Sequence, residues 1–178
     1  FLFWAGDGIG GALLLDDRLR RGATGGAGEI AFLQPPGADT VHRPHRSGSG
    51  ALELWAGGTA LADLAHECGL QGRGAVALVT AAVAAGPDGQ SFLDELAQRY
   101  AHGISSVIAV LDPGAIVLAG PVIDAGGEPL RARVEHHLDI LAVTSPRLLR
   151  GTVGGNPVLV GAMCTALDHA RATVFGAA

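Results

Sequence analysis

Residues 1–30 read FLFWAGDGIGGALLLDDRLRRGATGGAGEI. The apolar runs Phe1 to Ala5 and Ala12 to Leu15 flank the glycine-rich stretch GDGIGG at residues 6–11. Two short apolar runs across such a turn predict a β-hairpin. The stretch also fits G-x-G-x-x-G, the dinucleotide fingerprint, with Glu29 near the distance expected for the acid that follows it. That fingerprint needs a helix after the glycines, whereas Ala12 to Leu15 suits a strand better; both interpretations stay open at this point.

Beyond residue 30 the sequence alternates predicted helices and strands. An irregular loop rich in proline and glycine is expected over residues 34–50, and Thr59, Ser91 and Asn156 are predicted helix N-caps. This alternation predicts an α/β fold with a partly parallel sheet and no internal domain boundary. The predicted helices lie between Thr59 and Gly69, at Ala75 to Ala85, from Ser91 to Leu111, at about 128–141 and from Asn156 to about Val174; the predicted strands are Ala115 to Leu118 and Leu148 to Val153.

The composition of the 178 residues excludes several classes of function. The formal net charge of -5 argues against nucleic-acid binding by this chain alone. All 12 basic residues are arginine, which excludes any mechanism that needs a lysine nucleophile, a Schiff base or a phosphate-loop lysine. The 28 glycines follow no G-X-Y period, so the chain is not collagen-like. With 48 % hydrophobic residues, the chain can build a buried core.

Cysteine usage and the chain ends give expectations about compartment and completeness. Cys68 and Cys164 are too few for a disulfide framework or a structural zinc site, so we expect reduced thiols, with a single bridge as the alternative. No segment is expected to reach the roughly 18 apolar residues of a membrane span, and no signal peptide is visible. The chain opens in a predicted strand without a methionine, so we expect a fragment of a longer protein.

Four segments in order carry a resemblance to a known family. They are GDGIGGALLLDDRLRRGATGGAGEI at residues 6–30, ALELWAGG at 51–58, VLDPGAIVLAGPV at 110–122 and GAMCTAL at 161–167. Together they resemble the carboxy-terminal half of the ROK family, which groups sugar kinases with transcriptional repressors. The resemblance implies an actin-like, hexokinase-like (ribonuclease H-like) ATPase fold of class α/β, with residues 1–178 forming its carboxy-terminal lobe.

The sequence departs from the family at the structural zinc site, where the family has one histidine and three cysteines. Matching the family pattern onto this chain places Phe32 at the histidine position. Pro44, Arg46 and Ala51 stand at the three cysteine positions. None of the four replacements supplies a usual zinc donor, so no metal is expected. His42 and His45 lie in the same loop, and we expect solvated side chains there rather than a stray metal site.

A second departure falls in the phosphate loop, where the family's kinases cradle ATP phosphate on a glycine turn with a threonine or serine. The residues that match this loop are Gly6, Asp7, Gly8, Gly10 and Gly11. Asp7 thus replaces the hydroxyl residue, and a carboxylate ~4 Å from a phosphate oxygen costs about 4 kcal/mol per charge pair at an effective dielectric near 20. A bound Mg²⁺ would reverse that sign, and Asp7 can alternatively serve the turn alone. We interpret the loop as a degenerate phosphate loop.

Two further departures concern the nucleotide and the catalytic base. Gly120-Pro121 stands at the family's later glycine pair, near the nucleotide, and proline removes an N–H donor there. We interpret this segment as a degenerate nucleotide-side turn. The family's catalytic aspartate would lie upstream of residue 1, so this chain is not expected to be a complete kinase.

Glu29 and Glu53 match the two glutamates with which the family contacts sugar. A carboxylate accepts hydrogen bonds from vicinal hydroxyl groups, which explains the residue type. Alternatively, Glu29 satisfies loop N–H groups and Glu53 serves the first turn of a helix. The arginines at positions 18, 20 and 21 are expected on a solvated strand edge rather than in a DNA-binding patch.

The departures favour the sugar-sensing and oligomerisation portion of a ROK-type transcriptional regulator. We expect a cytoplasmic homodimer or homotetramer that binds a sugar or sugar derivative. DNA would be contacted only through an absent amino-terminal winged helix-turn-helix. No catalytic residue, cofactor or membrane partner is expected in this chain. Two alternatives remain at this point: a divergent, glucokinase-like ATP-dependent sugar kinase, and a relative that binds nothing and only dimerises.

Overall fold

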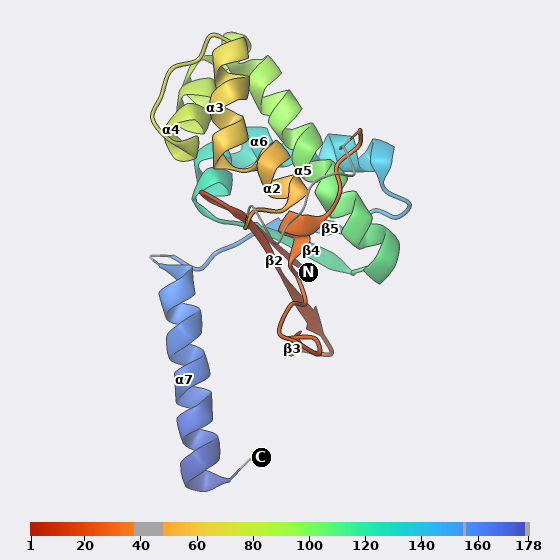
Figure 1. The fold of residues 1–178 in the computed structure, drawn as a ribbon, viewed down its shortest axis with the longest axis vertical. Coiled ribbons are helices and arrows are strands. Elements are labelled where there is room, and N and C mark those ends of the chain that lie inside the picture. The colour runs from red at the N-terminus through yellow and green to blue at the C-terminus, as the bar shows by residue number, and fades with distance from the viewer. Residues whose placement is uncertain (38–47, 155, 177–178) are drawn as a thin grey trace.

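The computed structural model describes residues 1–37, 48–154 and 156–176. A five-stranded sheet has the order β3-β2-β1-β4-β5. β1 pairs antiparallel with β2 and parallel with β4, and β4 pairs parallel with β5 (Figure 1). The strands are β1 Leu2–Ala5, β2 Ile9–Leu15, β3 Arg18–Arg20, β4 Ala115–Ala119 and β5 Arg147–Arg150; the helices are η1 Ile30–Phe32, α2 Ala51–Ala56, α3 Gly58–Glu67, α4 Ala75–Ala84, η2 Gly86–Gly89, α5 Gln90–Leu111, α6 Pro121–Leu141 and α7 Pro157–Phe175.

Alternation along the strands gives the sheet two different faces. Phe3 and Ala5 of β1, and Ile116 and Leu118 of β4, are buried in the core with the helices. The ring of Phe3 lies 5.1 Å from the ring of Tyr100 in α5, measured between centroids. Successive side chains of a strand point to opposite faces, so the intervening residues of β1 and β4 face away from this core.

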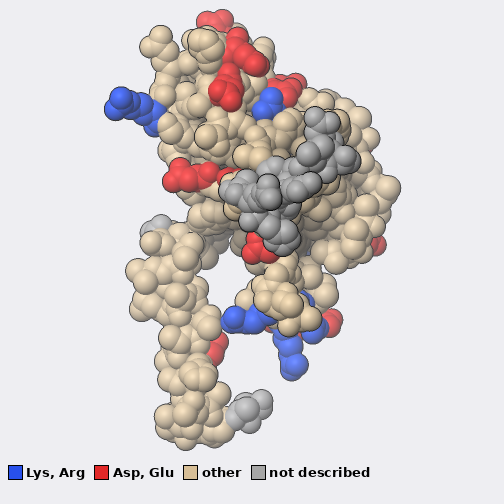
Figure 2. Space-filling view, viewed as in Figure 1, with Lys and Arg blue, Asp and Glu red and all other residues tan. Residues whose placement is uncertain are grey.

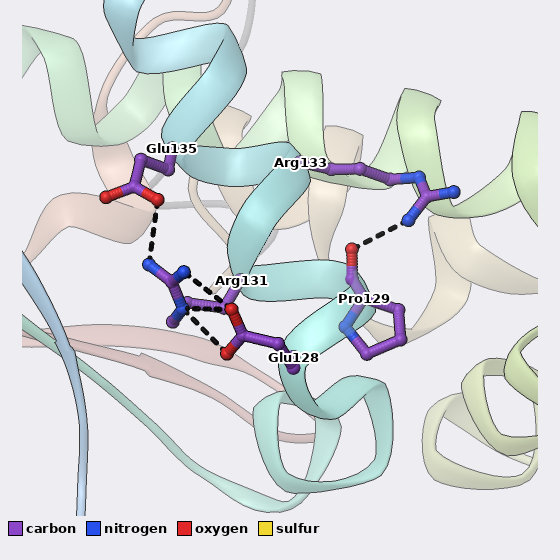
Figure 3. Close-up of polar contacts among 5 residues, drawn as sticks. All are labelled: Glu128, Pro129, Arg131, Arg133 and Glu135. Carbon is purple, nitrogen blue, oxygen red and sulfur yellow. Dashed lines mark hydrogen bonds and ion pairs between the residues drawn. The ribbon is translucent and has the colours of Figure 1, made fainter.

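The helix α6 is kinked near its start. Gly127 has φ 54° and ψ −144°, outside the helical range, and Pro129 follows within the helix. Beyond the kink, Arg131 donates to Glu128 at 2.6 Å and to Glu135 at 2.9 Å (Figure 3). Arg133 donates to the backbone carbonyl of Pro129 at 2.8 Å. This oxygen lies in the turn that follows the kink. These bonds support a turn where the regular helical pattern is interrupted.

The helix α7 projects away from the rest of the chain (Figure 1). None of its residues is buried, and its apolar side chains include Met163, which is 63 % exposed, and Phe175, which is 83 % exposed. Figure 2 shows that most of this projecting surface is uncharged. By length and composition α7 would pass as a membrane span, so the expectation that no segment qualifies is wrong. A single such helix is weak evidence, because helices that are buried inside soluble proteins pass the same test.

Most predicted elements are confirmed, with corrections at their ends. The β1–β2 pairing confirms the hairpin and leaves no helix after the glycines, so the dinucleotide fingerprint is wrong. Thr59 and Ser91 are not N-caps, because Gly57 and Gly89 cap α3 and α5 and both predicted caps lie inside the helices. The helix predicted at 128–141 begins at Pro121, since the kink hides its first turns. The Asn156 cap is confirmed, with Leu159 N donating to Oδ1 at 3.0 Å.

The strand predicted at Leu148 to Val153 is shorter, because β5 ends at Arg150. The arginines of the hairpin lie where the sequence predicts, on the exposed strand β3 at one edge of the sheet and just after it. Arg20 donates to Asp16 at 3.2 Å, and both side chains are largely exposed. Charged side chains on an edge strand keep that edge in contact with water, which is a common way to prevent edge-to-edge association.

Candidate functional site

The glycine-rich turn between β1 and β2 forms the centre of the candidate site. Gly6 N donates to the Gly8 carbonyl at 2.9 Å, which closes a tight reversal of the backbone. Asp7 lies at the tip of this reversal and is exposed. Its carbonyl oxygen accepts a hydrogen bond from Gly58 N at 3.2 Å. The turn is therefore attached to the start of α3 through its backbone, while the Asp7 side chain faces solvent.

The predicted phosphate loop is divided between this turn and β2. Gly10 and Gly11 lie within β2, paired with Trp4 and Phe3 of β1, so the turn predicted over residues 6–11 is too long and ends before Ile9. The error has a physical reason, because glycine is typical of turns, yet here the backbone pairing with β1 extends through both glycines.

The two strand glycines have different surroundings. A Cβ on Gly11 would lie 2.6 Å from the ring of Phe1 and 2.9 Å from the carbonyl of Gly28, so Gly11 allows the second glycine-rich loop to pack closely on β2. Nothing stands within 4 Å of a Cβ on Gly10. Directly paired residues of neighbouring strands share a face, so Gly10 lies on the face of the sheet that carries Trp4. Neither glycine belongs to the backbone reversal around Asp7.

Glu53 lies in the first turn of α2 and reaches the same glycine-rich turn. Its Oε2 accepts a hydrogen bond from Ile9 N at 2.6 Å. A Cβ on Gly8 would lie 3.5 Å from both carboxylate oxygens of Glu53, so this face of the turn is in contact with the carboxylate. The predicted first-turn position of Glu53 is confirmed, but its hydrogen bond goes to a distant strand rather than to its own helix.

Glu29 approaches the site from the second glycine-rich loop. It immediately precedes η1 and its side chain is exposed. A Cβ on Gly50, the N-cap of α2, would overlap the carbonyl of Ala31 in η1, so η1 and the start of α2 are in close contact. This contact brings the segments that carry Glu29 and Glu53 together, although they are separated by more than twenty residues of sequence.

The turn after β4 lies on the other side of the glycine-rich turn. Gly120 has φ 108°, and a Cβ there would overlap the Ala5 carbonyl at the end of β1. Pro121 is the first residue of α6, and a Cβ on Gly6 would lie 3.5 Å from its ring. The two segments that we interpret as degenerate nucleotide motifs, at Asp7 and at Pro121, are thus adjacent in space.

A cavity of about 670 Å³ opens beside this pair of turns, on the face of the sheet that turns away from the core. Its apolar floor includes Leu2, Val117 and Leu149, which are register neighbours on β1, β4 and β5. Trp4 also lines it, and its indole Nε1 would lie 3.2 Å from a Cβ on Gly6. The cavity extends to the carboxyl ends of parallel strands, where open α/β sheets bind ligands.

The two charged residues that line this cavity form an ion pair. Arg150 Nη2 lies 3.6 Å from Asp124 Oδ1. Both side chains are largely exposed, so this pair contributes little to stability and its groups are accessible to a ligand.

The positions that the family resemblance matches to zinc ligands fall partly within the described residues. Phe32 is the last residue of η1 and is 40 % exposed, whereas Ala51 is the first residue of α2 and is buried. Pro44, Arg46, His42 and His45 lie outside the described residues. Within residues 1–37, 48–154 and 156–176, no three histidine, cysteine or acidic side chains are grouped as metal ligands. Ala51 and Phe32 supply carbon alone where a zinc site needs nitrogen or sulfur.

The arrangement offers two kinds of chemistry. On one side, the Glu53 carboxylate touches the turn, and the segment that carries Glu29 packs against the start of α2. Carboxylates of this kind suit hydroxyl donors. On the other side, the cavity offers apolar surface, an indole and an ion pair. Sequence reasoning did not identify Trp4 or the bond between Glu53 and Ile9. The glycines at 8, 57 and 58 are the sequence signal of the Glu53 contact, because each lies against Glu53 or the Asp7 carbonyl, where a side chain would intrude.

Comparison with known proteins places this geometry in a family. The ROK family model matches residues 1–169. A bifunctional enzyme NanE/NanK from Brucella melitensis is 31 % identical over 156 residues, covering 86 % of this chain and 28 % of that protein. A ROK hexokinase from Thermus thermophilus has a TM-score of 0.75 at 25 % identity, over 96 % of this chain and 57 % of that one.

A ROK family transcriptional regulator, a homologue of the Escherichia coli MLC protein, has a TM-score of 0.68 at 20 % identity, over 84 % of this chain and 40 % of that one. Kinases and a regulator therefore share this fold, and the chain spans little more than half of the hexokinase and less of the other two proteins. The α/β sheet and these matches confirm the actin-like ATPase fold. Because the family model covers nearly the whole sequence, the chain belongs to the ROK family.

Proposed function

We propose that this chain is the sugar-sensing and oligomerisation portion of a ROK-family transcriptional regulator that works in the cytoplasm. One observation carries the choice of a regulator over a kinase. The exposed Asp7 carboxylate occupies the tip of the turn that cradles phosphate in the family's kinases, and the adjacent Pro121 offers no N–H at the start of α6. Both changes remove affinity for a nucleotide phosphate, and neither one harms a sugar site on the other side of the turn.

The sugar ligand is proposed to contact Glu29 and Glu53. Their two segments are joined through the contact between η1 and the start of α2. Carboxylate oxygens accept hydrogen bonds from neighbouring hydroxyl groups of one sugar ring. With Phe32 at the family's histidine position, we expect the sugar preference to differ from that of zinc-bearing members. No zinc and no other cofactor take part.

We further propose that residues 1–178 are one lobe of a longer protein. The chain spans 57 % of the Thermus hexokinase and 40 % of the regulator. The projecting helix α7 is apolar on most sides yet buries nothing, and a helix of that composition is normally covered by protein. An amino-terminal lobe would cover it, a winged helix-turn-helix ahead of that lobe would contact DNA, and the protein would act as a homodimer or homotetramer.

A divergent sugar kinase is the second candidate. The 25 % identity to a ROK hexokinase and the intact hairpin with its adjacent Gly120 turn favour it. In that case a Mg²⁺ ion beside Asp7 would have to reverse the repulsion of phosphate.

Calorimetry on the full-length protein separates the two candidates. We expect binding of at least one hexose or N-acetylhexosamine, no measurable ATP binding with Mg²⁺ present, and a sugar-dependent change in DNA affinity. An Asp7→Thr variant should gain nucleotide affinity if the carboxylate is what repels phosphate, and Asp88→Asn, at an exposed acid of η2, is its control. Sugar-dependent ATP consumption by the unaltered protein would establish the kinase instead. Absence of sugar binding would remove the sensing proposal.

A further inference from the structure

We propose that Glu53 is a positioning residue that clamps the glycine-rich turn to the corner between α2 and α3, and that a ligand held by Glu53 is thereby sensed at the turn. The clamp follows from contacts within this chain. Its response to a sugar rests on the proposed function.

The clamp consists of two hydrogen bonds, made by the residues on either side of Gly8, and both lead to the corner between α2 and α3. On one side, Glu53 Oε2 accepts from Ile9 N at 2.6 Å. On the other side, the Asp7 carbonyl accepts from Gly58 N at 3.2 Å. The first bond involves a charged acceptor and is short, as charge-assisted hydrogen bonds are. It therefore contributes more to holding the turn than the neutral bond between backbone groups does.

Glycines shape the space around the Glu53 carboxylate. A Cβ on Gly57 would lie 2.5 Å from both the backbone oxygen and Oε1 of Glu53. A Cβ on Gly8 would lie 3.5 Å from both carboxylate oxygens, and one on Gly58 would lie 2.9 Å from the Asp7 carbonyl. Three positions thus leave out their side chains where the corner and the turn meet. This close approach fits a built contact better than it fits a surface carboxylate that touches the turn incidentally.

The carboxylate lies close enough to the core to act on it. Tyr100 is fully buried, and its pKa is raised first by burial and second by the charge of Glu53. A partly buried carboxylate needs hydrogen-bond donors around it, and Ile9 N supplies one of them. A sugar hydroxyl would supply another at the same group. The ligand and the turn would therefore share one carboxylate.

The turn connects this carboxylate to the cavity on its other side. Gly6 lies against the Trp4 indole and the Pro121 ring, and both residues line the cavity system at the ends of β1 and β4. A ligand on Glu53 that fixes the carboxylate should make the turn more rigid and alter the surroundings of Trp4. Such a contiguous set of contacts can carry coupling between two sites.

Hydrogen exchange at the Ile9 amide tests the clamp in the full-length protein without ligand. Glu53→Ala should raise exchange at Ile9 by about tenfold or more, given the usual strength of a hydrogen bond to a charged group. Glu53→Gln, whose carbonyl oxygen can still accept, should restore most of the protection. Glu67→Ala, at an exposed acid at the end of α3, is the matched control and should change nothing. Equal exchange in Glu53→Ala and the control would overturn the clamp.

Gly57→Ala provides a second test if Glu53→Ala fails to fold. The new Cβ would crowd both the carboxylate and the backbone oxygen of Glu53 and would leave the charge in place, so exchange at Ile9 should rise as in Glu53→Ala. Unchanged exchange in a folded Gly57→Ala protein would also overturn the clamp.

Titration with glucose, or with whichever sugar calorimetry identifies, tests the coupling. We expect slower exchange at Ile9 and a change in fluorescence that is absent from Trp4→Phe. Sugar binding by calorimetry without either change would overturn the coupling and leave the proposed function intact. If no sugar binds, the proposed function and the coupling fail together, while exchange in the ligand-free variants still decides the clamp.

Discussion

Substitution of Gly120 by alanine should destabilise the protein strongly. Gly120 has φ 108° and ψ 161°, a region that is essentially restricted to glycine, and a residue forced into it costs about 1–3 kcal/mol. The added Cβ would also overlap the Ala5 carbonyl, so the end of β1 must shift. We expect a total near the upper end of that range, about 3 kcal/mol, which lowers Tm by roughly 6–12 °C in a domain of this size. Chemical and thermal denaturation followed by circular dichroism measures both quantities.

Gly114→Ala is the matched control for this prediction. Gly114 lies just before the opposite end of β4, and nothing stands within 4 Å of a Cβ placed there. Its substitution should change the free energy of unfolding by about 0.5 kcal/mol or less, as exposed sites usually do. A Gly120→Ala protein that unfolds within that margin of the control would contradict this prediction, because the backbone strain and the overlap would then have been relieved at no cost.

Three further predictions follow from the core, the kinked helix and the thiols. Phe3→Ala should lower the free energy of unfolding by about 3–5 kcal/mol in denaturant titrations, because a fully buried ring that packs on Tyr100 is lost. The hydrogen bond from Arg131 lowers the pKa of Glu128. The stability that this bond adds to the folded protein is therefore complete above the ordinary pKa of glutamate, and it is lost as the pH falls through the lowered pKa. In Arg131→Ala, the pKa of Glu128 measured by NMR titration should rise toward the ordinary value for glutamate. In the 178-residue chain, iodoacetamide should label exposed Cys164 before Cys68. The pKa of Cys68 is raised first by burial and then by nearby acids, which lowers its share of reactive thiolate. Mass spectrometry measures the two rates, and faster labelling of Cys68 would contradict this prediction.

The sequence predicts the fold well where local patterns and tertiary packing agree. The hairpin and the helix through Leu111 are visible in the sequence because hydrophobic spacing and turn residues indicate the same elements. The exact ends of elements are predicted less well. Gly10 and Gly11 have the composition of a turn, yet pairing with β1 draws them into β2. Ser91 is a favourable capping residue, yet the preceding 3₁₀ turn through Gly89 starts the helix earlier. Local preference at the end of an element is a small energy that neighbouring structure readily outweighs.

The candidate site was predictable in its residues and not in its contacts. Glu53 and the glycine-rich turn are recognisable through the family resemblance, but the bond from Ile9 to Glu53 joins positions 44 residues apart in the sequence. Nothing in local spacing identifies such a partner. The role of Trp4 was also hidden, because its place in an apolar run is equally typical of a core residue. The register of β1 against β4 is what places it on the face that lines the cavity.

The attachment of α7 has a mechanical consequence. The helix has 19 residues and is therefore about 28 Å long, at a rise of 1.5 Å per residue. Its near end follows Gly151, which is fixed to β4 by a 2.7 Å hydrogen bond from its N–H to the Leu118 carbonyl. Pro157 and Val158, at its near end, line the cavity, so a body that contacted Phe175 at the far end would act about one helix length away from the cavity.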